Sequence, residues 1–310
     1  MCNELDQITL NFSPNSLWWL DITLAIIMFG VALNLRISDF REVLKAPKAP
    51  LLGLFSQLII LPALTLLLVR LIRPCPSLAL GMFLVAACPG GNISNFISLL
   101  AKGNVALSVS LSALSTSLSV IFTPLSFTFW SGLYQPTADL MAQIAIDPFS
   151  IFIKILMILA LPLAIGMWVA QRFPNFTVKI GRPMRIMSIL IFGAYVVIAL
   201  ISNFEYFVKY ASYVIFLVMG HNAVALLAGY TVGRLGRLPE ADRRTLSIET
   251  GIQNSGLALV LIFSPIFNGL GGMAMIAAMW GLWHMVSGLS LGFVWSRSRQ
   301  GWKWKPEIVE

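Results

Sequence analysis

Long apolar runs dominate the chain and are separated by short polar connections. Most of them are about 20 residues long, which is the length an α-helix needs to cross the hydrocarbon core of a bilayer. The pattern therefore predicts an all-α polytopic membrane protein with nine transmembrane helices and no separate extramembrane domain. The runs lie at about 17–35, 50–70, 77–99, 104–131, 148–170, 184–202, 207–233, 244–266 and 272–295.

Polar, helix-breaking residues interrupt two of these runs at membrane depth. The third run contains CPGGNISN, Cys88 to Asn95, and the eighth contains ETGIQNSG, Glu249 to Gly256. By the predicted topology the two helices run in opposite directions, which indicates an inverted repeat. Discontinuous helices in matching positions of two halves are typical of secondary transporters with a site at the bilayer midplane. The alternative interpretation, that Pro89 and the glycines only kink helices for close packing, leaves Glu249 unexplained.

Glu249 is the one acidic residue predicted well inside a span. A charge at the bilayer centre costs roughly 2.5–3.5 kcal/mol even on lenient scales, and no Lys or Arg is predicted at its depth, so a bound cation is the expected partner. Hard cations such as Na⁺ prefer oxygen ligands. Serines in membrane helices also bond to their own helix, so their role stays open. The side chains that could supply oxygens are Gln57, Ser94, Asn95, Ser108, Ser112 and Gln253.

Composition and charge agree with a membrane protein. Hydrophobic residues make up 58% of the 310 positions and charged residues only 11%, which excludes an ordinary soluble chain. Lys and Arg number 21 against 13 acidic residues, and the predicted topology places 17 of the 21 on one face. Positive charge stays in the cytoplasm. The amino terminus is therefore predicted outside and the carboxyl terminus inside the plasma membrane, the inner membrane in a bacterium, and the net charge requires no nucleic-acid partner.

The cysteines and histidines point to no catalytic centre. Cys2, Cys75 and Cys88 form neither a metal cluster nor an even disulfide set, so we predict that they are structural. His221 and His284 are too isolated for a metal site. No set of nucleophile, base and orienting group is present, so an enzyme is not expected. For His284, packing and substrate contact both remain open.

Both interrupted segments resemble signatures of a known family. The stretches PGGNISNFISLLAKGNVALSVSLSALST and IETGIQNSGLAL, with IIMFGVALNL and LWHMVSG elsewhere, are similar to the bile acid:sodium symporter family. That family has ten helices in two inverted five-helix repeats, or nine when the first is absent, and the chain resembles the nine-helix form. The resemblance implies two crossing discontinuous helices in a core, about 50–131 and 207–295, moving against a panel of helices at about 17–35, 148–170 and 184–202.

The same resemblance implies a set of ligands. A first sodium site would use Ser94, Asn95, Ser108, Ser112 and Glu249. A second would use Gln57, Glu249, Gln253 and the carbonyl groups of Thr250 and Ile252. Substrate contacts would fall on Asn92, Asn254 and His284. The chain departs from the family pattern at Asn92, Ser112 and Met285, where a small hydroxyl residue, a threonine and an amide are expected.

The leading hypothesis is sodium-coupled symport of an organic anion, bile-acid-like or a small carboxylate, by alternating access, with two Na⁺ as coupling ions. A competing hypothesis is a proton-coupled or sodium-independent carrier in which Glu249 carries the proton. A ligand-binding membrane receptor is the third. Replacing Na⁺ with choline separates the first two, because only uptake by the competing carrier survives.

Overall fold

A computed structural model describes most of the chain. The described residues are 2–6, 29–30, 46–91, 93–143, 148–181, 183–184, 186–187, 190, 201, 204–263, 267 and 270–297. Most of the predicted span at 17–35 and most of that at 184–202 lie outside them. Over the described ranges the chain is helical, apart from one isolated bridge between two residues, so the predicted all-α class is confirmed.

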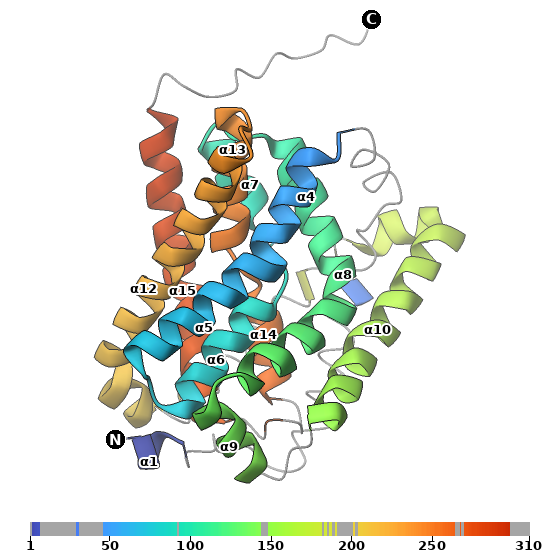
Figure 1. Ribbon diagram of the computed structural model, residues 1–310. Coiled ribbons are helices and arrows are strands. Elements are labelled where there is room, and N and C mark those ends of the chain that lie inside the picture. Colours follow the sequence, from blue (N-terminus) through green and yellow to red (C-terminus); the bar gives the residue numbers. More distant parts are fainter. Residues whose placement is uncertain are drawn as a thin grey trace, which may run out of the picture.

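The helices form one elongated bundle with the ends of the described chain at opposite poles (Figure 1). The short N-terminal helix α1 (Cys2–Leu5) lies at one pole, and α15 (Gly271–Ser296) ends at the other. The remaining elements, in chain order, are α4 (Lys48–Phe55), η1 (Ser56–Ile60), α5 (Leu61–Ile72), α6 (Pro76–Ala87), α7 (Ile93–Leu100), α8 (Val105–Gly132), α9 (Gln135–Gln143), α10 (Pro148–Arg172), α12 (Phe204–Leu235), α13 (Glu240–Gly251) and α14 (Ser255–Phe263).

Several predicted spans are found as helices. Four segments of the described chain are long and apolar enough to cross a membrane, at Lys48–Ile72, Val105–Gly132, Val208–Leu235 and Gly271–Ser296. The 25-residue α10 occupies the predicted span at 148–170. A polytopic membrane protein is therefore supported, while the count of nine helices stays a prediction. Helix α9 was not predicted; it follows α8 at the pole where α1 lies (Figure 1).

The segment Lys48–Ile72 is a continuous helix with one π-helical turn, η1, in its middle. A π-helical turn is wider than an α-helical turn. Pro62 follows the wide turn η1 and has no N–H with which to bond the carbonyl four residues back. The Leu61 N–H instead bonds Ser56 O, five residues back. Wide turns of this kind are frequent at functional sites. Here the turn carries Ser56 and Gln57, whose side chains are fully buried in the bundle.

Both predicted interruptions are present. Helices α6 and α7 are separated by the first break, residues 88–91, and α13 and α14 by the second break, residues 252–254. Cys88 adopts an extended conformation, with φ −73° and ψ 156°, as expected for a residue that precedes a proline. In the second break, which has no proline, α13 ends at Gly251 and Ile252 leaves helical geometry.

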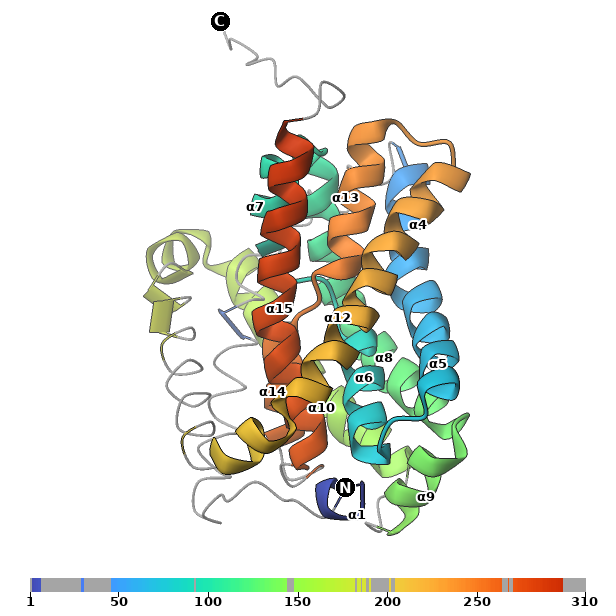
Figure 2. The ribbon, with the colours of Figure 1, turned by 90° about the vertical axis from the view of Figure 1, so that its left-hand side faces the viewer.

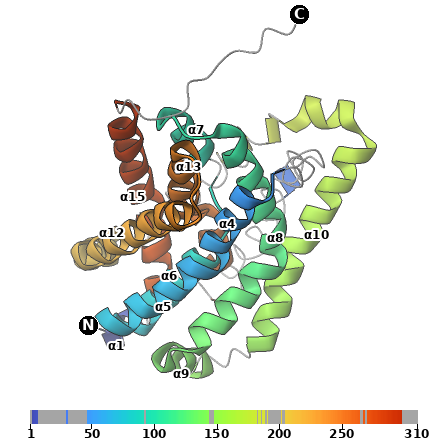
Figure 3. The ribbon, with the colours of Figure 1, turned by 45° about the horizontal axis from the view of Figure 1, so that its top comes forward.

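The centre of the bundle is built around α6. Every residue of this helix from Ser77 to Ala87 is buried, as expected for a short helix that is apolar on all sides. Helices α8, α14 and α15 pack against it. Helix α10 lies on the side of α8 away from α12 and α15 (Figures 2 and 3). The predicted assignment of α10 to a separate panel is compatible with this position and stays a prediction.

The buried Arg244 fastens α13 to its neighbours. Its guanidinium is 1% exposed in relative area and donates to Ala101 O at 3.0 Å and Trp295 O at 3.2 Å. These carbonyls belong to the ends of α7 and α15, where helices leave backbone acceptors without partners. Glu240, one turn away, forms an ion pair with the same guanidinium. The end of α13 remote from its break is therefore held against two helices.

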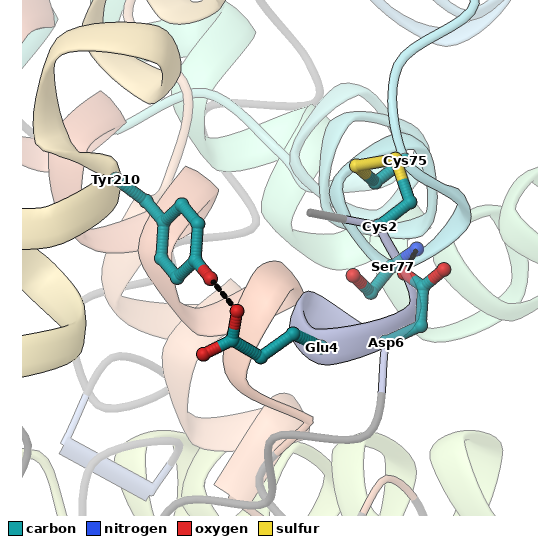
Figure 4. Close-up of a disulfide and its surroundings, with 6 residues drawn as sticks. All are labelled: Cys2, Glu4, Asp6, Cys75, Ser77 and Tyr210. Atoms are coloured by element: carbon teal, nitrogen blue, oxygen red, sulfur yellow. Dashed lines mark hydrogen bonds between the residues drawn. A yellow bond between two sulfur atoms is a disulfide. The ribbon is translucent and has the colours of Figure 1, made fainter.

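The N-terminal anchor joins the start of the chain to α6, to the connection that precedes it and to α12 (Figure 4). We define it by Cys2, Glu4 and Asp6 together with their partners. Cys2 forms a disulfide with Cys75, and the Asp6 carboxylate accepts from the Ser77 N–H at 2.8 Å. Glu4 accepts from Lys209 at 2.5 Å and from the Tyr210 hydroxyl at 2.7 Å.

The disulfide agrees with the prediction that the cysteines are structural, although the odd count of three did not predict this pair. Cys2 and Cys75 are 73 residues apart, and spacing alone cannot show that the start of the chain returns to the connection between α5 and α6. The odd count leaves Cys88 as a free, buried thiol in the first break. Two of the three cysteines are therefore a covalent link at the pole where α1 lies.

Candidate functional site

The two breaks cross and pair with each other. Gly91 N donates to Ile252 O at 2.7 Å, and Asn254 N donates to Pro89 O at 2.8 Å. Between these bonds, Gly90 and Gln253 form an isolated antiparallel bridge. Each break thus supplies backbone partners that the other lost when its helix ended, which lowers the cost of non-helical backbone at this depth. The crossing fixes which side chains meet.

The Glu249 carboxylate lies at this crossing and is fully buried. Its Oε1 accepts hydrogen bonds from Ser94 Oγ, at 2.5 Å, and from Ser108 Oγ. Ser112 Oγ lies 3.3 Å from Oε1 and 3.2 Å from Oε2. Since each hydroxyl donates a single proton to the carboxylate, its oxygen lone pairs stay available to a cation. Three of the predicted ligands, one serine of α7 and two of α8, therefore contact the carboxylate of Glu249.

No basic side chain neutralises this carboxylate within the described residues. The ion pairs found there join Lys209 to Glu4 and Arg243 and Arg244 to Glu240, and none involves Glu249. A buried charge without an opposite charge is costly. The carboxylate therefore needs either a proton or a bound cation.

Three amide side chains, in η1, in α7 and in the second break, have an oxygen without a hydrogen-bond partner among the described residues. These oxygens are Gln57 Oε1, Asn95 Oδ1 and Gln253 Oε1, each with no accessible surface. The amide nitrogens of the two glutamines do form hydrogen bonds. Gln57 Nε2 donates to Glu249 O at 2.8 Å, and Gln253 Nε2 donates to Thr250 O at 2.8 Å. Buried polar atoms are normally paired. Unpaired oxygens beside an uncompensated carboxylate are the donor set that a hard cation such as Na⁺ fits.

Gly90 leaves room beside the acid. A Cβ atom built on this residue would lie 2.9 Å from Glu249 Oε2 and 3.2 Å from Gln57 Nε2. Any larger residue would fill the space between the carboxylate and the first break. The glycine therefore serves the site by being small, in addition to ending a helix.

Carbonyl groups of the second break also have defined partners. Besides the bonds to Glu249 O, Thr250 O and Ile252 O, Gly251 O accepts from Asn222 Nδ2 at 2.7 Å. A carbonyl oxygen has a second lone pair. The two predicted carbonyl ligands, Thr250 O and Ile252 O, can therefore coordinate a cation in addition to accepting these hydrogen bonds. The Thr250 side chain is held separately, by a 2.9 Å hydrogen bond with Ser56.

The predicted substrate residues are less closely gathered. Asn92 lies outside the described residues. The Asn254 side chain accepts from the Leu257 N–H at 3.0 Å, so its oxygen caps α14 in the manner of an N-cap asparagine. His284 is 6% exposed, and its Nδ1 has no hydrogen-bond partner among the described residues. Within the described residues, no hydrogen bond joins the side chain of His284 to Glu249.

Sequence reasoning missed several residues that support the breaks. Ser115 Oγ accepts from Gly90 N at 3.3 Å, and Thr123 Oγ1 donates to Ala87 O at 2.8 Å. Both continue the face of α8 that carries Ser108 and Ser112, so a spacing of three or four residues could have revealed them. Asn222 is an isolated amide in an apolar span, the same signal that identified Gln57.

Comparisons with known proteins agree with the family resemblance of the sequence. The sequence profile of the Sodium Bile acid symporter family matches residues 21–210. The chain is 31% identical, over 93% of its length and 88% of the relative's, to the uncharacterized sodium-dependent transporter YocS of Bacillus subtilis (strain 168). It is also 31% identical, over 92% of its length and 68% of the relative's, to the probable sodium/metabolite cotransporter BASS1, chloroplastic, of Arabidopsis thaliana.

Proposed function

The chain belongs to the sodium bile acid symporter family, and we propose that it is a sodium-coupled transporter that imports an organic anion. The family is one of transporters, so transport rather than catalysis is the expected activity. The similar proteins named above are described as sodium-dependent or as sodium/metabolite cotransporters. That shared feature favours Na⁺ as the coupling ion here.

The observation that carries the proposal is the buried carboxylate with unpaired oxygens around it. Glu249 has no basic partner among the described residues, and Gln57 Oε1 and Gln253 Oε1 have no donor. A proton on Glu249 would neutralise the charge and leave both amide oxygens unpaired. A sodium ion would satisfy the charge and the oxygens together, so the geometry favours sodium over the proton-coupled alternative.

Two ions are proposed to share Glu249. The hydroxyls of Ser94 and Ser108 bond its Oε1, and Ser112 Oγ lies between the two oxygens, 3.3 Å from Oε1 and 3.2 Å from Oε2. With Asn95 these serines would hold the first ion. Gln57 lies on its Oε2 side, with Nε2 at 3.5 Å. With Gln253 and the carbonyl groups of Thr250 and Ile252 it would hold the second.

Two sodium ions moving with one monovalent anion would carry one net positive charge inward. Each elementary charge crossing 100 mV contributes about 2.3 kcal/mol, so import would be driven by the membrane potential as well as by the sodium gradient. We propose alternating access as the mechanism, with the helices around the two breaks moving against a panel that includes α10. The crossing would then be exposed to each side in turn.

The substrate is proposed to be an organic anion, either bile-acid-like or a small carboxylate. An anion near two bound cations is electrostatically favoured, and the N-terminus of α14, capped by Asn254, adds a favourable helix dipole. Asn92, Asn254 and His284 are the proposed contacts. Two departures of the chain from the family pattern concern this part of the site, one at Asn92 itself and one at Met285, next to His284.

The proposed orientation places α1 outside the cell and the end of α15 in the cytoplasm. Disulfides persist in oxidising compartments, and the Cys2–Cys75 bond joins α1 to the connection between α5 and α6. At the opposite pole lie the end of α7 and the connection from α12 to α13 (Figure 1). These parts of the chain carry Lys102, Arg234, Arg237 and Arg243, in agreement with an excess of positive charge on the cytoplasmic side. We propose the plasma membrane as its location.

Uptake into proteoliposomes tests the proposal. Purified protein should accumulate a labelled bile acid or carboxylate from a screened set when Na⁺ is outside, and accumulation should stop when choline replaces Na⁺ at fixed pH. Uptake that persists in choline would favour the proton-coupled or sodium-independent carrier. A protein that binds a ligand without accumulating it would instead be a receptor.

A further inference from the structure

Asn222 of α12 connects the second break to α15. Its side chain is fully buried. Nδ2 donates to Gly251 O at 2.7 Å, and Oδ1 accepts from Ser287 Oγ at 2.6 Å. One amide thus touches the last residue of α13, two positions from Glu249, and a hydroxyl on a different helix.

The chemistry fixes the direction of these bonds. A backbone carbonyl can only accept, so Asn222 must present its NH₂ group to Gly251 O. Its oxygen is then left to accept the proton of Ser287. Both bonds are short and buried, where hydrogen bonds are stronger and an unpaired group costs more than in water. The amide cannot rotate without losing both partners.

Ser287 has a second acceptor within reach. Its Oγ lies 3.2 Å from His284 O, one turn earlier in α15. The single hydroxyl proton of Ser287 therefore has two possible acceptors, Asn222 Oδ1 and His284 O. The position of Asn222 determines which of the two it bonds. The chain of hydrogen bonds runs from Gly251 through Asn222 and Ser287 to the turn of α15 that carries His284.

We propose that Asn222 is a positioning residue that links occupancy of the Glu249 site to the structure of α15 near His284. The inference rests on the proposed sodium-coupled function. An ion at the Glu249 site fixes the adjoining backbone of the second break, including the Gly251 carbonyl. Asn222 then holds Ser287 in one arrangement, and the turn at His284 becomes ordered before substrate binds.

An apolar contact offers a competing route. Ile252 packs close to Gly288 of α15, since a Cβ built on that glycine would lie 2.8 Å from Ile252 Cδ1. Replacing Asn222 or Ser287 leaves this packing in place. Variants at these two positions therefore separate the polar route from the apolar one.

Hydrogen–deuterium exchange of the full-length protein in detergent tests the link, with NaCl against KCl as the only added probe. In the wild type, Na⁺ should slow amide exchange both at residues 249–254 and at residues 284–288, by about fivefold or more, the lower end of typical coupling between sites. Asn222→Ala and Ser287→Ala should keep the protection at 249–254 and lose it at 284–288.

Ser287→Thr keeps the hydroxyl and should restore the protection of α15, which a simple loss of packing would not explain. Ser290→Ala, at an exposed position of the same helix, is the matched control and should behave as wild type. Ser287→Ala removes only one half-buried hydroxyl, so the test holds even if Asn222→Ala fails to fold.

Each other outcome is decisive. If both alanine variants keep full protection at 284–288, Asn222 does not carry the link. If wild-type 249–254 is protected by Na⁺ but 284–288 is not, the link is wrong while the sodium site stands. If Na⁺ protects neither segment of the wild type, the proposed sodium site itself is wrong, and the link with it.

Discussion

The crossing of the two breaks and the N-terminal anchor are both rich in polar groups, yet their carboxylates have opposite surroundings. In the anchor, Glu4 has two donors, Asp6 caps the start of α6, and Cys2 is bonded covalently. At the crossing, a buried carboxylate has no basic partner in the described chain, and amide oxygens beside it have no donor.

The comparison distinguishes polar groups that stabilise the fold from polar groups that are available to bind a ligand. A satisfied polar group stabilises the fold and gains nothing from an added ion, whereas an unsatisfied one has a cost that binding can remove. Changes at the crossing should therefore alter transport and the response to sodium. Changes in the anchor should alter stability and leave the response to sodium intact.

The largest effect is expected from Glu249→Gln, which keeps the size of the side chain and removes its charge. Removing one partner of a buried ion pair costs about 3–5 kcal/mol, more than a hundredfold in ion affinity at about 1.4 kcal/mol per tenfold. Sodium-driven uptake in proteoliposomes should fall to the level of empty vesicles. If the variant is correctly inserted and takes up substrate at the wild-type rate, Glu249 is not a ligand of the coupling ion.

Gly90→Ala should impair the site without removing any ligand. The added methyl group would lie 2.9 Å from Glu249 Oε2, and overpacking typically costs about 1–3 kcal/mol. The sodium concentration for half-maximal uptake should rise about tenfold. Gly220→Ala is the control, because a Cβ there would meet no atom within 4 Å; equal behaviour of the two variants would contradict the proposed role of Gly90.

Gln253→Ala should weaken sodium binding to a similar or smaller extent. It removes an unpaired oxygen together with the bond from Nε2 to Thr250 O, and hydrogen bonds to charged groups are worth about 1.5–3 kcal/mol. Isothermal titration with Na⁺ measures the loss. Gln135→Ala, at the start of α9 where the amide bonds Asp139, should leave the titration unchanged, and an unchanged titration for Gln253→Ala too would exclude its oxygen as a ligand.

Cys2→Ser should lower stability and spare transport. Crosslinking residues 73 apart typically contributes about 2–4 kcal/mol. Thermal unfolding should begin several degrees lower for the variant, and reductant should lower the wild type to the same value. Sodium should still raise both melting temperatures by equal amounts, and a smaller sodium effect in the variant would show that the anchor is not separate from the site.

The smallest effect concerns Glu4, whose pKa is lowered from 4.5 because Lys209 and Tyr210 donate hydrogen bonds to its charged form. This stabilisation is present above the ordinary pKa and is lost as the pH falls through the lowered one. Lys209 and Glu4 are 54% and 48% exposed, so Glu4→Gln should lower the melting temperature by only about 1 °C at neutral pH. The difference should shrink as the pH falls below 4.5 and vanish once the pH is below the lowered pKa of Glu4; a constant difference would point to lost packing.

Much of this architecture could be predicted from the sequence. Apolar runs long enough to span a bilayer predicted α8, α10, α12 and α15, since helix length is set by membrane thickness. Pro89 and its glycines predicted the first break, because proline interrupts the helical hydrogen bonds and glycine destabilises a helix. The cluster of Ser94, Ser108 and Ser112 on Glu249 followed from the oxygens flanking the breaks and from the family resemblance.

Other features depend on how distant segments meet. The Cys2–Cys75 bond and the Ser56–Thr250 and Asn222–Gly251 contacts join residues far apart in the chain. The sequence shows no period that relates them. The wide turn that turns Gln57 inward depends on Pro62 five positions later, an effect that a count of apolar residues does not contain.

The most direct test is the thermal stability of the purified protein as a function of sodium at constant ionic strength, with K⁺ as the replacement ion. A ligand that binds only the folded state stabilises it by about 2.7 kcal/mol at a hundred times its Kd. We predict that Na⁺ raises the melting temperature of the wild type progressively and leaves Glu249→Gln unchanged. Equal stabilisation of both proteins by Na⁺, or no difference between Na⁺ and K⁺ in the wild type, would contradict a sodium site at Glu249.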